Sequence, residues 1–490
     1  MSETPVLVGI AQNEQRPEDP QTAREPLALM LDALKAAAED AGAPELLSSA
    51  GSVRVIRGRW PYKNPARVVA DSLGIPNAET ALTRFGGNFV QTTVNQAALD
   101  IQAGKQDIIL ITGAECGSTQ AKATRAGLDL RTDLPWQDAP GEPDLWIGAD
   151  QPMFHEYERA VGILQPIQIY PMFENALRAH LGEGVEEHQR NISELWARFS
   201  AVAATNPHAW LKDARSAEEI RTLSEFNRPV SFPYPKLMNS NNNVDQGAAL
   251  ILCSEKKARA LNIPEEKWIY PWAGTDAHDA YMTSNRSSFC ESPAIRIGGG
   301  RVLELAGLTP AELDHVDVYS CFPVAVQVGA REIGLDLERP LTVTGGLTFA
   351  GGPLNNYVMH SIARMAELLR AEPDAKGLIT ANGGYLTKHA FGVYSATPPS
   401  TPFRHQDVQD EVDQIPLKDV VEVHDGNASV ESYVVMYAGG APKTAFISAL
   451  VDDNTRTWAT TEDPDVMQAM TVEEFCGKPV QLSAKQAHFG

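Results

Sequence analysis

The sequence predicts an α/β protein made of two similar halves, followed by a small all-β domain. Residues 6–12 (VLVGIAQ) form an apolar run, and residues 26–42 then place apolar side chains at helical spacing. Residues 88–115 give a helix, a turn and a strand that is apolar on both faces, which is typical of a parallel sheet covered by helices. The same order recurs at 298–322 and 357–384, where GGGR at 298–301 is expected to begin a helix. This recurrence indicates a duplicated architecture.

Two segments break this pattern. Residues 116–235 contain helices separated by Pro- and Gly-rich connectors, which indicates an inserted, mostly helical loop domain. After residue 400 apolar and polar residues alternate, as in VVEVHDGNASVESYVVMY, which indicates a small barrel or sandwich. The predicted domains are 1–115 with 236–265 (N-terminal half), 116–235 (inserted loop domain), 266–400 (C-terminal half) and 401–490 (β-domain).

Composition excludes several kinds of partner. A net charge of −22 repels nucleic acid and acidic membrane surfaces, and no apolar run approaches the ~20 residues that span a bilayer. The polar N-terminus differs from a secretory signal, so we expect a cytoplasmic protein. Five cysteines without CxxC spacing predict neither a disulfide framework nor a zinc site. We expect no metal, no nucleic acid and no membrane among its ligands and partners.

Five segments together resemble the thiolase superfamily in order and spacing. They are RFGGNFVQTTVNQAA (84–98), MNSNNNVDQGAALILCSEKKARAL (238–261), VDVYSCFPVAVQVGAREIGLD (316–336), TGGLTFAGGPLNNYVMHSIARM (344–365) and GLITANGGYLTKHAFGVYS (377–395). The resemblance covers most of residues 5–396 and implies the duplicated, five-layered αβαβα thiolase fold. GGLTFAGGPLNNY, NGGYLTKHAFGVYS and the added β-domain resemble the thiolase-like protein type 1 group in particular. The resemblance to that group implies that the protein binds coenzyme A derivatives.

The resemblance also fails at the positions that matter for thiolase chemistry. Aligned on the family motifs, Gly86 stands at the acyl-accepting cysteine, Gly352 at the histidine of Gly-His-Pro, and Ala381 at the second cysteine. Acyl transfer through a cysteine needs a thiol of low pKa beside a base, so we do not expect that route. Thiolase-fold steroid side-chain aldolases are a second similar group, since they also lack the cysteine pair and move protons with tyrosines.

Carbon–carbon cleavage without a cysteine needs a base and hydrogen-bond donors for an enolate. The predicted catalytic residues are Tyr319 as a donor or proton-transfer group, His389 as a base, and Asn355 and Asn356 as oxyanion donors, with Lys388 or Tyr385 assisting. The predicted ligand-binding residues are Asn88, Gly352, Gly384 and Lys236. Each has a structural alternative: core packing for Tyr319, a structural role for His389, and helix capping for Asn88 and Asn356.

The sequence therefore leaves three functions open. The first is a thiolase-like enzyme of acyl-CoA and lipid metabolism, of acyltransferase or retro-aldol type, acting without the usual cysteine on an acyl-CoA substrate, with no covalently bound cofactor. The alternative is a non-catalytic acyl-CoA-binding or scaffold protein that kept the thiolase fold. The third is an acyltransferase that uses Cys116 or Cys321. The β-domain is expected to cover the edge that ordinary thiolases bury on dimerisation, which predicts a monomer, with a homodimer as the other possibility.

Overall fold

Two mixed sheets form the body of the protein in a computed structural model that describes residues 3–130, 132–134 and 136–490. The first sheet has the strand order β1-β8-β4-β2-β3-β5, and the second has the order β10-β11-β12-β9-β13. The first comprises β1 (Pro5–Glu14), β2 (Ser52–Val55), β3 (Glu79–Thr83), β4 (Ile108–Cys116), β5 (Leu145–Ile147) and β8 (Asp245–Ser254). The second comprises β9 (Tyr270–His278), β10 (His315–Asp317), β11 (Lys376–Gly383), β12 (Lys388–Ser395) and β13 (Arg404–Asp407). The expected α/β class is confirmed.

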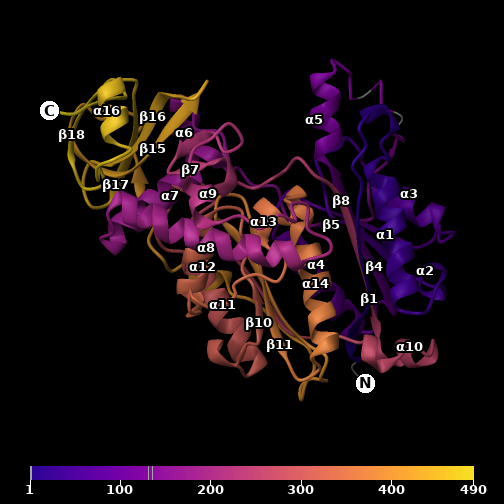
Figure 1. Ribbon diagram of the computed structural model, residues 1–490. Coiled ribbons are helices and arrows are strands. Elements are labelled where there is room, and N and C mark those ends of the chain that lie inside the picture. Colours follow the sequence, from indigo (N-terminus) through magenta and orange to yellow (C-terminus); the bar gives the residue numbers. More distant parts are fainter. Residues whose placement is uncertain (1–2, 131, 135) are drawn as a thin grey trace.

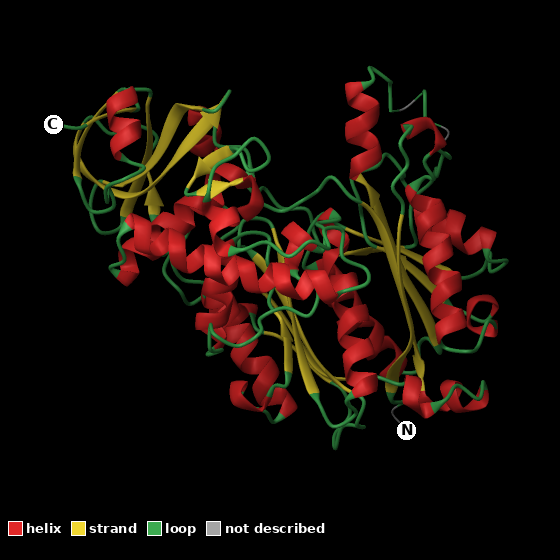
Figure 2. Cartoon of the chain, in the orientation of Figure 1, coloured by secondary structure: helices red, strands yellow, loops and turns green. Residues whose placement is uncertain are grey.

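Helices cover both sheets and separate them, which gives the five layers seen in Figures 1 and 2. On the outer face of the first sheet lie α1 (Pro26–Asp40), α2 (Glu45–Ser48) and α3 (Pro65–Ser72). Between the sheets lie α4 (Phe89–Gln102) and α14 (Tyr357–Ala371), and beyond the second sheet lie α11 (Pro293–Ala306) and α12 (Pro323–Ile333). Because α4 is covered on both sides, apolar residues occupy most of its circumference, including Val90, Val94, Ala97 and Ile101.

The described residues of the inserted segment form five helices. They also contribute strands to two different sheets. The helices are α5 (Gly117–Arg125), α6 (Glu156–Val161), α7 (Pro166–Leu181), α8 (Val185–Thr205) and α9 (Ala217–Arg221). Strand β5 pairs with β3 in the first sheet, whereas β6 (Pro229–Phe232) and β7 (Tyr234–Pro235) extend the C-terminal sheet. Short helices α10 (Glu255–Ala260), α13 (Gly346–Phe349) and α15 (Gln409–Val412) complete the connections. Within the described residues, every helix is too short or too polar to cross a bilayer.

The C-terminal β-rich domain is built around one long hairpin. Its own elements are β14 (Asp419–Val420), β15 (Gly426–Ala438), β16 (Ala441–Leu450), β17 (Thr455–Thr461), α16 (Pro464–Ala469), β18 (Pro479–Ser483) and β19 (Gln486–His488). Phe232 of β6 pairs with Val435 of β15, so the inserted segment contributes to this sheet. Strand β13 belongs instead to the second sheet of the body. Sheet membership therefore crosses the expected limits at residues 235 and 400.

One expected helix start is wrong. Helix α11 begins at Pro293, so the glycines at 298–300 lie inside it and not at its first turn. A Cβ on Gly298 would lie 2.8 Å from Phe391 Cε2, and one on Gly299 would lie 2.7 Å from Ile333 Cγ1. These two glycines allow the helix to pack closely on β12 and α12.

Candidate functional site

A two-glycine turn, Gly86–Gly87, lies where the two halves of the fold meet. It precedes α4, and the end of β11 approaches it so closely that a Cβ on Gly383 would lie 3.1 Å from Gly87 N. Asn88 is the N-cap residue of α4, but its side chain caps no backbone N–H, and its buried Oδ1 has no partner among the described residues. The first N–H groups of a helix have no acceptor within it and favour negative charge, so this turn can bind a developing oxyanion.

Lys388 reaches this turn from β12. Its Nζ donates to the Phe85 carbonyl oxygen at 2.6 Å and lies 5.0 Å from the centre of the Phe89 ring. A Cβ on Gly86 would lie 2.7 Å from this nitrogen. Burial lowers the pKa of Lys388 to about 8, an effect that the carboxylate of Asp150 partly opposes. An appreciable fraction of the amine is therefore neutral near pH 7.

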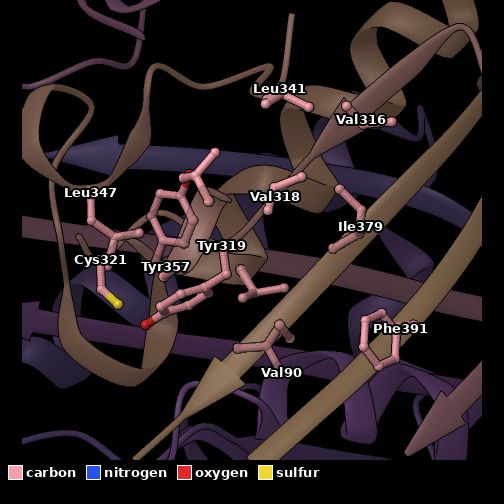
Figure 3. Close-up of a cluster of buried hydrophobic side chains, with 14 of the residues drawn as sticks. Val90, Val316, Val318, Tyr319, Cys321, Leu341, Leu347, Tyr357, Ile379 and Phe391 are labelled. Atoms are coloured by element: carbon pink, nitrogen blue, oxygen red, sulfur yellow. The ribbon is translucent and has the colours of Figure 1, made fainter. Parts of the chain in front are cut away.

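Tyr319 lies against the second glycine of the turn. A Cβ on Gly87 would lie 2.8 Å from the Tyr319 hydroxyl, which forms no hydrogen bond with the described residues. Its ring packs edge-on against Tyr357, at 5.5 Å between centroids, and its hydroxyl lies beside the Cys321 side chain (Figure 3). Burial, and next Cys321, raise the pKa of Tyr319 well above its usual value. At neutral pH this phenol is a hydrogen-bond donor and not a base.

A buried carboxylate that no sequence motif singles out holds this tyrosine pair in place. Asp317 is fully buried at the end of β10, two residues before Tyr319. It accepts hydrogen bonds from Thr342 Oγ1 at 2.9 Å, Ser361 Oγ at 2.8 Å and Tyr357 Oη at 3.1 Å. Burial raises the pKa of Asp317, and these donors oppose the increase. The network ties β10 to α14 and so fixes the ring against which Tyr319 packs.

His389 faces the other side of the second sheet. Successive residues of a strand point to opposite faces, so the imidazole points away from the Lys388 amine. His389 is only 2% exposed, its Nε2 has no hydrogen-bond partner among the described residues, and Asp279 Oδ2 lies 3.9 Å away. Burial lowers its pKa to about 4. It lines a cavity of about 10 Å³ together with Tyr319 and Asn382, which is room for about one water molecule.

Asn355 and Asn356 bind backbone carbonyl groups of the N-terminal half. The Asn355 amide donates to Arg57 O at 2.8 Å, and the Asn356 amide donates to Gly113 O at 2.9 Å. Asn356 is the N-cap residue of α14, but its side chain caps no N–H, and its buried Oδ1 is without a partner among the described residues. Both amides therefore join the two halves beneath the site.

The four expected ligand-binding residues do not gather at one point. Asn88 belongs to the glycine turn. Gly352 instead lies next to Asn241, because its N–H donates to Asn241 O at 2.9 Å. Gly384 has a φ of +74° just after β11, and its carbonyl accepts from Tyr170 Oη at 3.1 Å. Lys236 is exposed directly after the inserted segment, where its N–H donates to Arg228 O at 2.9 Å.

A groove of about 590 Å³ lies beside Lys236, and nothing in the residue pattern predicts it. It is lined by Leu211, Asp213, Arg215, Glu218, Glu219, Thr222, Ser224, Phe226, Asn227, Leu237 and Phe349. Phe226 is 81% exposed at its rim. Arg228 directly follows the lining residue Asn227, and Lys236 directly precedes the lining residue Leu237. Neither cation forms an ion pair with a described residue. These two cations therefore stand beside the groove, whose own charged lining residues are Asp213, Arg215, Glu218 and Glu219.

Comparison with known proteins decides the family. Residues 407–486 match the family model described as the thiolase-like protein type 1 additional C-terminal domain. The crystal structure of a monomeric SCP2-thiolase like protein type 1 from Mycobacterium smegmatis is 31% identical, with a TM-score of 0.83 over 99% of both chains. The chain belongs to the SCP2-thiolase-like protein type 1 family. The resemblance found in the sequence is thereby confirmed, as is the thiolase-like fold with its C-terminal β-rich domain.

Other relatives of this thiolase-like protein are more distant. The Ltp2–ChsH2(DUF35) aldolase shares 20% identity and a TM-score of 0.61, over 80% of this chain and 97% of that chain. Acetyl-CoA acetyltransferase of Methanocaldococcus jannaschii is 23% identical over 274 residues, which are 55% of this chain and 60% of that protein. That of Schizosaccharomyces pombe is 30% identical over 169 residues, 34% and 39% of the two chains. This chain thus spans less than two thirds of these acetyltransferases.

The two thiols considered for acyl transfer in this thiolase-like protein are buried. Burial raises the pKa of Cys321 to about 12, and its sulfur accepts from Asn382 Nδ2 at 3.8 Å. Burial also raises the pKa of Cys116 well above its usual value. Both thiols are protonated at neutral pH, and a protonated thiol is a poor nucleophile.

Proposed function

We propose that this thiolase-like protein catalyses carbon–carbon bond cleavage or formation on an acyl-CoA thioester without a cysteine acyl intermediate. One observation carries the proposal: the Tyr319 hydroxyl and the Lys388 amine both lie against the Gly86–Gly87 turn. A phenol that donates and an amine that is partly neutral are the two kinds of group that enolate chemistry needs.

The expected roles follow from this geometry. The N-terminus of α4 and the Tyr319 hydroxyl would stabilise the thioester enolate by hydrogen bonds. Asn355 and Asn356 would hold the wall of the site through the carbonyl groups that they bind. His389 is neutral because its pKa is lowered. It would interact with Tyr319 through a water molecule in the small cavity that the two residues share.

The groove beside Lys236 is the part of the surface that suits coenzyme A. Its apolar wall would take the pantetheine chain, and Arg228 and Lys236 would take the phosphates. Its own acidic residues, Glu218 and Glu219, oppose this binding, and Arg215 is already paired with Glu219 at 3.3 Å. The named activity of the acetyltransferase relatives supports a coenzyme A thioester as the ligand.

The test is product analysis by mass spectrometry. The protein would be incubated with β-keto and β-hydroxy acyl-CoA panels, with and without free coenzyme A. Shortened thioesters that are lost in Tyr319→Phe, and kept in Tyr394→Phe, support the proposal. Tyr394 is the control because it is also buried but donates to Gln91 at 2.8 Å, away from the turn. Thioesters that bind at equilibrium and return intact would favour the non-catalytic alternative.

A further inference from the structure

The Lys388 amine occupies the space that a side chain at position 86 would fill. Its Nζ lies 2.7 Å, and its Cε 3.1 Å, from the point where a Cβ on Gly86 would stand. One N–H is directed at Phe85 O, which leaves the remaining positions on the nitrogen for a substrate. The side chain is 9% exposed, so it is largely shielded from solvent.

The charged groups around this amine form no ion pair with it. Within the described residues, no carboxylate oxygen lies within 4 Å of Lys388 Nζ. Asp150, which partly opposes the lowering of the Lys388 pKa, is paired with Arg84 at 3.0 Å. His278 of β9 is the residue opposite Lys388 in the strand register, and its Nδ1 contacts Asp279 O at 3.0 Å. On the α4 side the neighbour is the Phe89 ring. Tyr319, at the next glycine, is the remaining titratable group of the turn.

From this arrangement we propose that Lys388 is the catalytic base that removes the proton of a substrate hydroxyl, so that the substrate is a β-hydroxyacyl thioester cleaved by a retro-aldol reaction. This inference rests on the proposed function and narrows it. A β-keto thioester has no hydroxyl proton for this amine to accept, and its cleavage needs a nucleophile instead.

The step balances without any further reagent. The neutral Nζ takes the hydroxyl proton, the oxygen forms a carbonyl group, and the bond between the α and β carbons breaks. Its electron pair becomes the enolate of the shorter thioester, stabilised at the glycine turn. The enolate carbon then takes a proton from the Lys388 ammonium group, which restores the neutral amine. The products are one aldehyde or ketone and one shortened acyl thioester.

The first part of the test measures the pKa of the Lys388 amine in the absence of substrate. The whole protein would be acetylated with limiting acetic anhydride between pH 6 and 11, and each lysine quantified by peptide mass spectrometry. We expect Lys388 to titrate at about 8, and Lys256, whose side chain is 80% exposed, to serve as the surface control. A Lys388 that titrates with Lys256, or that no reagent reaches, overturns the inference and leaves the proposed function standing.

The second arm measures cleavage of 3-hydroxyacyl-CoA thioesters. We expect Lys388→Met to lose at least ~100-fold in kcat, as is usual for removal of a general base, while Lys256→Met is unchanged. Wild-type kcat/KM, which reports ionisations of the free enzyme, should rise with pH up to about 8, and Lys388→Arg, which cannot give up its proton, should be as slow as Lys388→Met. Circular dichroism of Lys388→Met and Lys388→Arg checks that these two variants fold. Cleavage of 3-ketoacyl thioesters alone, or full activity in Lys388→Met, overturns the inference but not the proposed function. Inertness toward both substrate classes overturns both.

Discussion

Lys388 Nζ lies 2.7 Å from the point where a Cβ on Gly86 would stand, so the amine and a side chain at position 86 exclude each other. The two residues come from different halves of the duplicated fold. In the motif resemblance described above, position 86 stands at the acyl-accepting cysteine. Under the proposed function, the Lys388 amine would take the place of that thiol as the reactive group.

Restoring the thiol should not restore thiolase chemistry. In Gly86→Cys the new side chain would displace only side-chain atoms, the Asn88 amide oxygen at 2.6 Å and the flexible end of Lys388, so the free energy of unfolding should fall by about 1 kcal/mol, the lower end of the usual cost of overpacking. Acetic anhydride labelling should then show the pKa of Lys388 moving up toward that of a surface lysine. Intact-mass analysis after rapid quench with acetyl-CoA should find no acyl group on the introduced thiol. An acyl adduct there would mean that the amine does not control the site.

Gly87 should tolerate the addition of a side chain far less well than Gly86. A Cβ on Gly87 would lie 2.5 Å from the backbone oxygen of Asn382 and 2.8 Å from the Tyr319 hydroxyl. Backbone cannot move aside as a lysine tip can, so Gly87→Ala should lower the free energy of unfolding by ~1–3 kcal/mol. Gly300→Ala is the control: this exposed glycine lies in α11 with no atom within 4 Å of its Cβ position, and alanine there should stabilise by roughly 0.5–1 kcal/mol. Equal urea midpoints for the two variants would refute the close approach at Gly87.

Local patterns and family motifs predicted most of the body of the fold. The buried run of β1 and the helical spacing of α1 are local properties, and both elements formed where the pattern indicated. The donation of β6 to the C-terminal sheet escaped prediction because Phe232 and Val435 pair across a large part of the chain. For the same reason the position of Lys388 at the turn could not be predicted: its partner Phe85 is 303 residues away. The spacing of residues within one motif cannot predict a contact between residues so far apart in the sequence.

The Asp317 network should be a major source of local stability. Asp317→Ala would leave buried hydroxyl and N–H groups without their acceptor, and it should cost ~3 kcal/mol in chemical denaturation. Ser361→Ala removes only one donor and should cost ~1 kcal/mol. The Asp317 variant should also slow any Tyr319-dependent reaction, because Tyr357 would lose one of the contacts that hold its ring. Equal costs for the two variants would argue against a shared network.

Acid should destabilise the fold through His389. Its pKa falls from 6.5 to about 4 on folding, so below pH 6.5 the unfolded chain binds a proton that the folded chain does not. Stability from this residue is therefore present above pH 6.5 and is lost as the pH falls toward 4. Between pH 7 and pH 5, wild type should lose roughly 2 kcal/mol more than His389→Gln, in which the group cannot titrate. Parallel pH curves for the two proteins would show that His389 binds protons equally in the folded and unfolded states, so that its pKa is not lowered on folding.

One buried arginine should contribute strongly to the junction between the C-terminal domain and the body. Arg456 of β17 is fully buried and binds Glu431 through Nε at 2.6 Å, and its Nη1 donates to the carbonyl groups of Ser284 and, at 2.9 Å, Arg286. Arg456→Met would leave Glu431 unpaired and three carbonyl groups of residues 283–286 without this donor, at a cost of ~3–5 kcal/mol.

Amide hydrogen exchange distinguishes a local effect of Arg456→Met from a global one. Exchange should speed up in β17 and around residues 283–286, while the buried strand β4 of the first sheet keeps its protection. Lys478→Met is the control, since its ion pair with Glu473 at 3.0 Å is exposed and should contribute under ~1 kcal/mol. If protection were lost equally in β4, the domain and the body would unfold as one unit. Arg456 would then stabilise the whole chain and not the junction alone.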